Sequence, residues 1–232
     1  MSVATAVIGG VFWIVAGFLW VARRDERRAL AQLEGVDPSV GELTAGTFSA
    51  VRGEVRSAQP ETDPVTGEPV AYWEARLERL DDAGRRVRLL LVEGGEELTV
   101  DGVRVALHGA QIDIDEAPPV RAEGIPNEAM RALLEGTPHA LPPPDETRPE
   151  KGVRWELTVR RITLGETLTL LGTPIKGDDG LVFDGLPRLT PTALEVIVEE
   201  ERLASRAMDR LIVLAAVIGV GAFLAAVLLA VA

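Results

Sequence analysis

The hydrophobic pattern of the chain is dominated by two runs without a charged residue, at residues 3–22 and 211–232. Each run has about the length that a helix needs to cross the hydrocarbon core of a bilayer. All charged residues lie between the two runs. The pattern therefore predicts two transmembrane helices that flank a polar body, with juxtamembrane helices at residues 23–36 and 200–210.

The placement of arginines predicts how these spans are oriented. The arginines nearest to the two runs all lie on the side of the central segment: Arg23, Arg24, Arg27, Arg28, Arg202, Arg206 and Arg210. Because basic residues favour the cytoplasmic side, we expect a cell-membrane protein with a cytoplasmic body, both termini outside, and the lipid bilayer as a partner. A cleaved signal peptide is the alternative for the first run, but four arginines follow it and no basic residue precedes it.

Small residues spaced four apart occur in both runs. They form three pairs: Ala6 with Gly10, Ala215 with Gly219, and Gly221 with Ala225. This spacing lets two helix backbones approach closely. The pairs predict either packing of the two spans against each other or a homo-oligomer formed through the spans.

Between the runs, residues 40–199 show the alternation of apolar and polar side chains that is typical of strands. Five segments carry it: residues 51–55, 71–77, 87–91, 103–107 and 153–159. Short strands separated by turn-forming residues predict a mainly β domain, a small antiparallel barrel or sandwich, of α+β character with one or two short helices.

Three further segments complete this prediction. Residues 125–134 predict one short helix, with Pro126 in its first turn. Residues 136–150 are rich in proline and predict a stiff loop. This loop could divide two domains, but neither half alone has enough strands to close a sheet, so we expect one domain. Residues 194–198 predict its last strand.

Composition excludes several classes of function. The net charge of −12 disfavours binding to nucleic acid. The chain has no cysteine, which excludes disulfides, thiolate zinc sites and cysteine nucleophiles. His108 and His139 have no partner of a catalytic kind nearby in the sequence, and Asp113, Asp115 and Glu116 are most simply a solvated strand face. We therefore expect no catalytic residue, no metal site and no cofactor.

Three motifs in order resemble the GIDE domain, also called the beside-a-membrane domain. They comprise Arg52, Gly53 and Val55; then Pro64, Thr66, Gly67, Pro69 and Tyr72 or Trp73; then Gly165, Glu166 and Gly172. Asp63 stands where the family usually has serine, and Arg161 where it usually has an acidic residue. The resemblance implies a prokaryotic member that lies between two membrane spans. The family's ubiquitin ligases carry a zinc-binding RING domain, which a chain without cysteine cannot build.

The segment from Asp63 to Tyr72 allows two interpretations. It can be a turn with a structural role, in which Trp73 joins the apolar face and Tyr72 points the other way. Alternatively, it can form a binding surface for a ligand or partner. The candidate residues of that surface are Arg52, Asp63, Thr66, Gly67 and Tyr72.

The sequence leaves three hypotheses for function. The first is a non-catalytic binding or scaffold protein that presents a GIDE-like domain to an unidentified protein partner. The second is an enzyme of unrecognised type, either a hydrolase or, by the family's label alone, a ubiquitin ligase. An enzyme predicts carboxylates of raised pKa in a cleft. The third is a structural role in helix-driven assembly.

Overall fold

The computed structural model describes residues 3–36, 43–135, 137–141, 149 and 151–231. The chain divides into two units. We call residues 1–37 together with 193–232 the helical unit, and residues 38–192 the strand unit.

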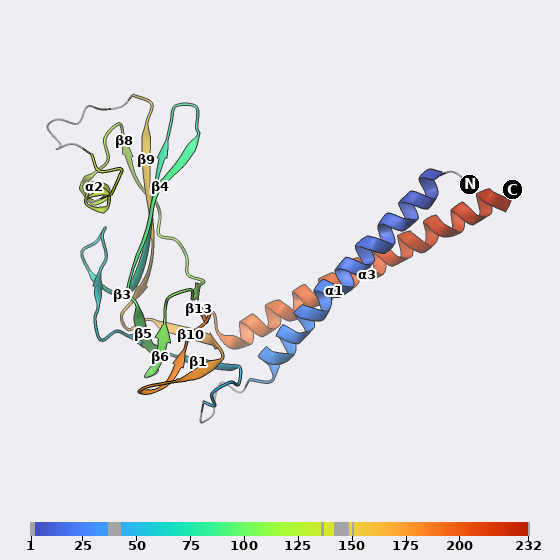
Figure 1. The fold of residues 1–232 in the computed structure, drawn as a ribbon, viewed down its shortest axis with the longest axis horizontal. Helices are drawn as coiled ribbons and strands as arrows, with labels where there is room; N and C mark the ends of the chain where they lie inside the picture. Colours follow the sequence, from blue (N-terminus) through green and yellow to red (C-terminus); the bar gives the residue numbers. More distant parts are fainter. Residues whose placement is uncertain (1–2, 37–42, 136, 142–148, 150, 232) are drawn as a thin grey trace. The chain divides into compact units, whose positions relative to one another are not determined.

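The helical unit consists of two long helices, α1 (Val3–Glu34) and α3 (Leu194–Val231). They lie side by side along their length (Figure 1). Ion pairs link their charged parts: Arg23 pairs with Asp209, and Arg202 Nε donates to Glu34 Oε1 at 2.7 Å. Each helix therefore runs without a break from a charged segment into a charge-free one.

The prediction of two transmembrane helices is wrong. Among the residues that the structure describes, no helix combines the length and the apolar character needed to cross a membrane. The predicted fold class, a β domain between two membrane spans, is therefore wrong. The predictions of a cell-membrane location, a cytoplasmic body and outer termini are wrong for the same reason. Each charge-free run is part of a longer helix, α1 or α3, that also carries charged residues and packs against its partner.

The strand unit contains two sheets. The larger, within the described residues, has the strand order β11-β12-β6-β5-β1-β10-β13-β7. In chain order these strands are β1 (Ser49–Arg56), β5 (Glu97–Val100), β6 (Val103–Ala106), β7 (Gln111–Ile112), β10 (Thr167–Gly172), β11 (Pro174–Gly177), β12 (Gly180–Phe183) and β13 (Arg188–Thr190). Two pairs, β12 with β6 and β13 with β7, are parallel. The sheet is thus mixed, whereas we expected antiparallel pairing throughout.

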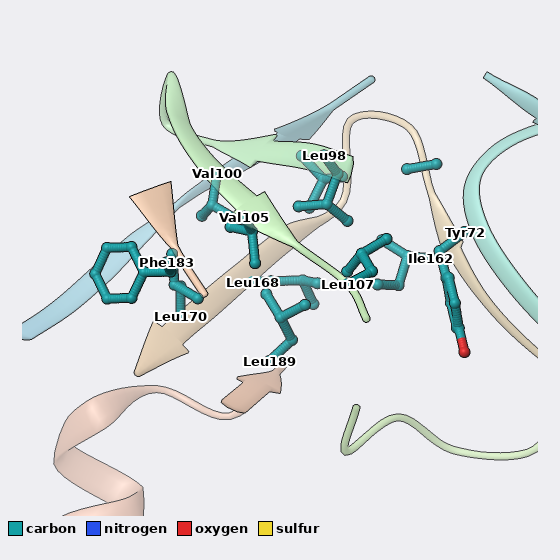
Figure 2. Close-up of a cluster of buried hydrophobic side chains, with 12 residues drawn as sticks. Tyr72, Leu98, Val100, Val105, Leu107, Ile162, Leu168, Leu170, Phe183 and Leu189 are labelled. Carbon is teal, nitrogen blue, oxygen red and sulfur yellow. The ribbon is translucent and has the colours of Figure 1, made fainter. Parts of the chain in front are cut away.

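The core of this larger sheet is apolar and fully enclosed. Its side chains come from segments far apart in the sequence, and Val55 of β1 is one of them. Figure 2 labels the others: Leu98, Val100, Val105, Leu107, Leu168, Leu170, Phe183 and Leu189. Ala71, Tyr72 and Ile162 from the second sheet join the same cluster. The two sheets therefore share a core at one end of the second sheet.

The second sheet is built on two long paired strands, β3 (Pro69–Leu80) and β9 (Arg154–Thr163) (Figure 1). Three shorter strands extend it: β2 (Glu61–Thr62) and β4 (Arg86–Gly94) pair with β3, and β8 (Val120–Glu123) pairs with β9. Alternation along β3 and β9 puts residues such as Leu77 and Leu157 on one face.

Helix α2 (Glu128–Leu134) packs on that apolar face through the buried Met130 and Leu134. The side chain of Asn127 caps the helix, since its Oδ1 accepts a hydrogen bond from Met130 N at 3.0 Å. The opposite face of the sheet is charged. There, Arg86 donates to the nearly buried Glu78 at 2.9 Å and to Glu156 at 3.4 Å.

Two predicted segments take a different place in the structure. Residues 194–198, expected as the last strand, form the first turns of α3. Leu194 and Ile197 are buried while Val196 is half exposed, which is the spacing of a helix and not of a strand. In the predicted proline-rich loop at 136–150, residues 136, 142–148 and 150 lie outside the described residues.

Candidate binding site at the turn between β2 and β3

The turn between β2 and β3 is held in one conformation by Asp63. Its Oδ1 accepts hydrogen bonds from Val65 N at 2.7 Å and from Thr66 N at 3.0 Å. Its backbone carbonyl accepts one from Gly67 N at 2.9 Å. Gly67 has φ +73°, a value that glycine adopts without strain. The residues DPVTG therefore form this turn for local reasons.

The carboxylate of Asp63 also ties the turn to a neighbouring strand. Asp63 is 1% exposed, and its Oδ2 accepts a hydrogen bond from Arg161 of β9 at 2.7 Å. Burial alone would raise the pKa of Asp63. The hydrogen bond from Arg161, those from the amides of Val65 and Thr66, and the charge of Arg161 outweigh it, so the pKa is lowered. Asp63 is thus ionised at neutral pH and paired.

The turn exposes several consecutive residues to solvent. Residues 65–68 are exposed, and we call Val65, Thr66, Gly67 and Glu68 the turn surface. Thr66 Oγ1 accepts a hydrogen bond from Glu68 N at 3.3 Å. The turn surface is therefore attached to β9 through the ion pair of Asp63 with Arg161, and its backbone is held by the hydrogen bonds to Asp63.

Tyr72 does not belong to this surface. It is 3% exposed and lies in the core shared by the two sheets (Figure 2). Its hydroxyl donates to Glu93 Oε2 at 3.1 Å. Burial raises the pKa of Tyr72, and the negative charges of Glu93 and Glu74 raise it further. Tyr72 was expected on the polar side of its strand, and that expectation is wrong.

A register shift explains this placement. In the pairing of β3 with β9, Val70 lies opposite Thr163 and Tyr72 opposite Ile162, so an extra residue is accommodated at Ala71. Such an irregularity re-aims the side chains beside it. Val70, Ala71 and Tyr72 are consequently all buried, which strict alternation does not allow.

Arg52 has its contacts in the larger sheet. Its Nη1 donates to Thr169 Oγ1 of β10 at 2.7 Å and to the carbonyl of Pro191 at 3.3 Å. Of the five candidate residues, the structure gathers Asp63, Thr66 and Gly67 in one turn. Arg52 and Tyr72 have other partners. The binding role of all five stays a prediction.

The small residues expected to pack helices are placed unevenly. In α3, Gly219 is buried and Ala215 is half-buried, whereas Gly221 and Ala225 are exposed. The side chains of Ala6 and Gly10 lie outside the described ones. Their packing role also stays a prediction.

Other groups singled out in the sequence are exposed or paired. His108 and His139 are exposed. Asp113 accepts a hydrogen bond from Arg188 at 2.8 Å, and Glu116 accepts one from Arg160 at 2.9 Å. Over the described part of the chain, no group of three or more histidine, aspartate or glutamate residues is placed to hold a metal ion.

Two residues that contact the candidate site residues could not be identified from the sequence. Arg161 neutralises Asp63, and Glu93 accepts the hydrogen bond of Tyr72. The position of Arg161 was noted only as a departure from a family pattern. Nothing local marks Glu93, because it reaches Tyr72 through the pairing of β3 with β4.

Comparison with known proteins finds no family model, no curated protein and no solved structure that matches the chain. The site is therefore interpreted from its own geometry.

Proposed function

We propose that this chain is a non-catalytic binding or scaffold module that contacts a protein partner through the turn surface, Val65 to Glu68. The observation that carries the proposal is the pair of the buried Asp63 with Arg161, which fixes the turn while leaving its outer side chains exposed. A loop on a rigid base is the usual location of binding residues.

The turn is ordered before any partner binds, and this favours binding. A loop that is already ordered loses little conformational entropy when a partner is bound. Asp63 achieves this with three hydrogen bonds to its side chain. Val65, an apolar residue 36% exposed at the tip, provides a surface that gains from being covered.

The carboxyl groups whose pKa is shifted give no support to the enzyme hypothesis. That hypothesis needs carboxyl groups whose pKa is raised. In the strand unit the pKa of Asp63 is lowered, and so are those of Asp81 and Glu97. The backbone hydrogen bond from Arg85 is the main cause at Asp81, and the side-chain hydrogen bond from Arg104 is the main cause at Glu97. These carboxylates are held in ion pairs and are not poised to take up a proton.

The resemblance to the GIDE domain is part of the same proposal. Asp63, Val70, Ala71 and Arg161 depart from the family's pattern, and two of them are in contact. In this chain the side chains of Asp63 and Arg161 form an ion pair with an Nη1–Oδ2 distance of 2.7 Å. This ion pair ties the turn to β9, which is compatible with a GIDE-like turn that has its own means of attachment.

Site-specific photocrosslinking tests the location of the surface. A photoreactive amino acid replaces Val65 in one full-length variant and Ala83 in another. Ala83 is a matched control, because it is exposed in the turn between β3 and β4 of the same unit. We expect a discrete adduct from position 65 in the protein's own cell extract and none from position 83. Equal adducts from both positions, or none from position 65, would reject the turn surface.

A further inference from the structure

An arginine-rich stripe lies on one face of α1. It consists of residues at helical positions i, i+3, i+4, i+7, i+8 and i+11: Trp20, Arg23, Arg24, Arg27, Arg28 and Ala31. This spacing places all six on one face of the helix. Together they line a hollow of about 350 Å³.

The charge of this hollow contrasts with that of the chain. The net charge of the whole chain is −12, yet four guanidinium groups converge here. The lining of the hollow thus carries arginine charge in an otherwise acidic chain.

Part of the stripe contacts α3, and part of it is exposed. Asp209 of α3 pairs with Arg23 but lies 3.8 Å from the Nη2 of Arg27. The Nε of Arg23 is buried without a hydrogen-bond partner among the described residues. Arg24, Arg27 and Arg28 are exposed at the mouth of the hollow. Guanidinium groups in this arrangement bind phosphate oxygens in pairs.

We propose that the hollow lined by Trp20, Arg23, Arg24, Arg27 and Arg28 binds an anionic phosphate group. Trp20 is 59% exposed at one end of the stripe and can donate its indole N–H to the same anion. The phosphate can belong to a soluble phosphate ester or to the headgroup of a phospholipid molecule.

Binding to two probes distinguishes the sources. The full-length chain is titrated calorimetrically with pyrophosphate, and it is floated with vesicles of phosphatidylcholine containing phosphatidylglycerol. Vesicles of phosphatidylcholine alone are the blank. The test variant is Arg24→Gln with Arg27→Gln, since both side chains are exposed and glutamine is a good helix former. The control, Arg56→Gln with Lys176→Gln, removes the same charge from exposed positions of the strand unit.

We expect the test variant to bind about tenfold more weakly and the control variant to bind like the wild type. Arginine-dependent binding to vesicles alone identifies a lipid headgroup, and arginine-dependent binding to pyrophosphate identifies a soluble phosphate. Three results would overturn the proposal: no binding of either probe by the wild type, unchanged binding by the test variant, or an equal loss in the control.

Discussion

The buried carboxylate of Asp63 forms an ion pair with Arg161 that joins the turn before β3 to the neighbouring strand β9, with 2.7 Å between Oδ2 and Nη1. Asp63 is 1% exposed, and the guanidinium of Arg161 is partly accessible. The same carboxylate accepts two amide hydrogen bonds from the turn. One side chain thus links the shape of the turn to the stability of the sheet.

Replacing this carboxylate by an amide should destabilise the strand unit. In Asp63→Asn the charge that pairs with Arg161 is lost, while an acceptor for the turn amides remains. We expect the free energy of unfolding to fall by about 2 kcal/mol, as for other hydrogen bonds to charged groups. Chemical denaturation followed by near-ultraviolet circular dichroism measures it. Asp179→Asn is the control. Its carboxylate is largely exposed and makes a long contact of 3.5 Å with Arg104, so its loss should cost little stability.

The same pair should make stability depend on pH in the acid range. The pKa of Asp63 is lowered in the folded protein, so its contribution is complete above its unfolded pKa, about 3.9. It is lost as pH falls through the lower, folded pKa. The stability difference between wild type and Asp63→Asn should therefore be constant near neutral pH and shrink below about pH 4. A difference that stays constant down to pH 2 would show that Asp63 is not stabilised in its charged form.

Tyr72 offers a titration with a single reporter, because it is the only tyrosine in the sequence. Its pKa is raised by burial and by the charges of Glu93 and Glu74. Absorbance of the phenolate should appear well above the ordinary value of about 10 in the folded chain. Since the folded pKa exceeds the unfolded one, stability should decline as pH rises past 10. Glu93→Gln should move the titration back toward lower pH, and an unshifted wild-type titration would place Tyr72 in solvent.

Leu186 is a strained position whose replacement should stabilise the strand unit. It has φ +78° and is 76% exposed, so it bears the cost of a left-handed backbone without burying its side chain. Asparagine tolerates this conformation better. We expect Leu186→Asn to raise the free energy of unfolding by about 1 kcal/mol. Leu164→Asn, at another exposed leucine without a positive φ, should give no such gain.

Local signals were sufficient to predict much of the strand unit. Asp63, Pro64 and Gly67 predicted the turn that the structure has there, and Asn127 begins the short helix expected at residues 125–134. These features depend on contacts between residues close in sequence. The same is true of the alternation along β3 and β9, except where the register shifts.

Other features depend on interactions between residues far apart in the sequence, and the sequence did not predict them. The irregularity at Ala71 turned Tyr72 into the core, and it arises only when β3 is paired with β9. Residues 194–198 satisfy a strand pattern and a helix pattern equally, and continuation into the rest of α3 decides for the helix. The charge-free runs predicted membrane spans, but no described helix meets the requirements for one. Arg161 becomes part of the site only through the fold.

The most direct test of the account compares the crosslinked adduct from position 65 in the wild-type background with that in Asp63→Asn. If the ion pair holds the turn surface ready for a partner, the adduct should decrease strongly in Asp63→Asn and stay at the wild-type level in the control Asp179→Asn. An adduct of equal yield in all three proteins would contradict the claim that Asp63 and Arg161 preorganise a binding surface.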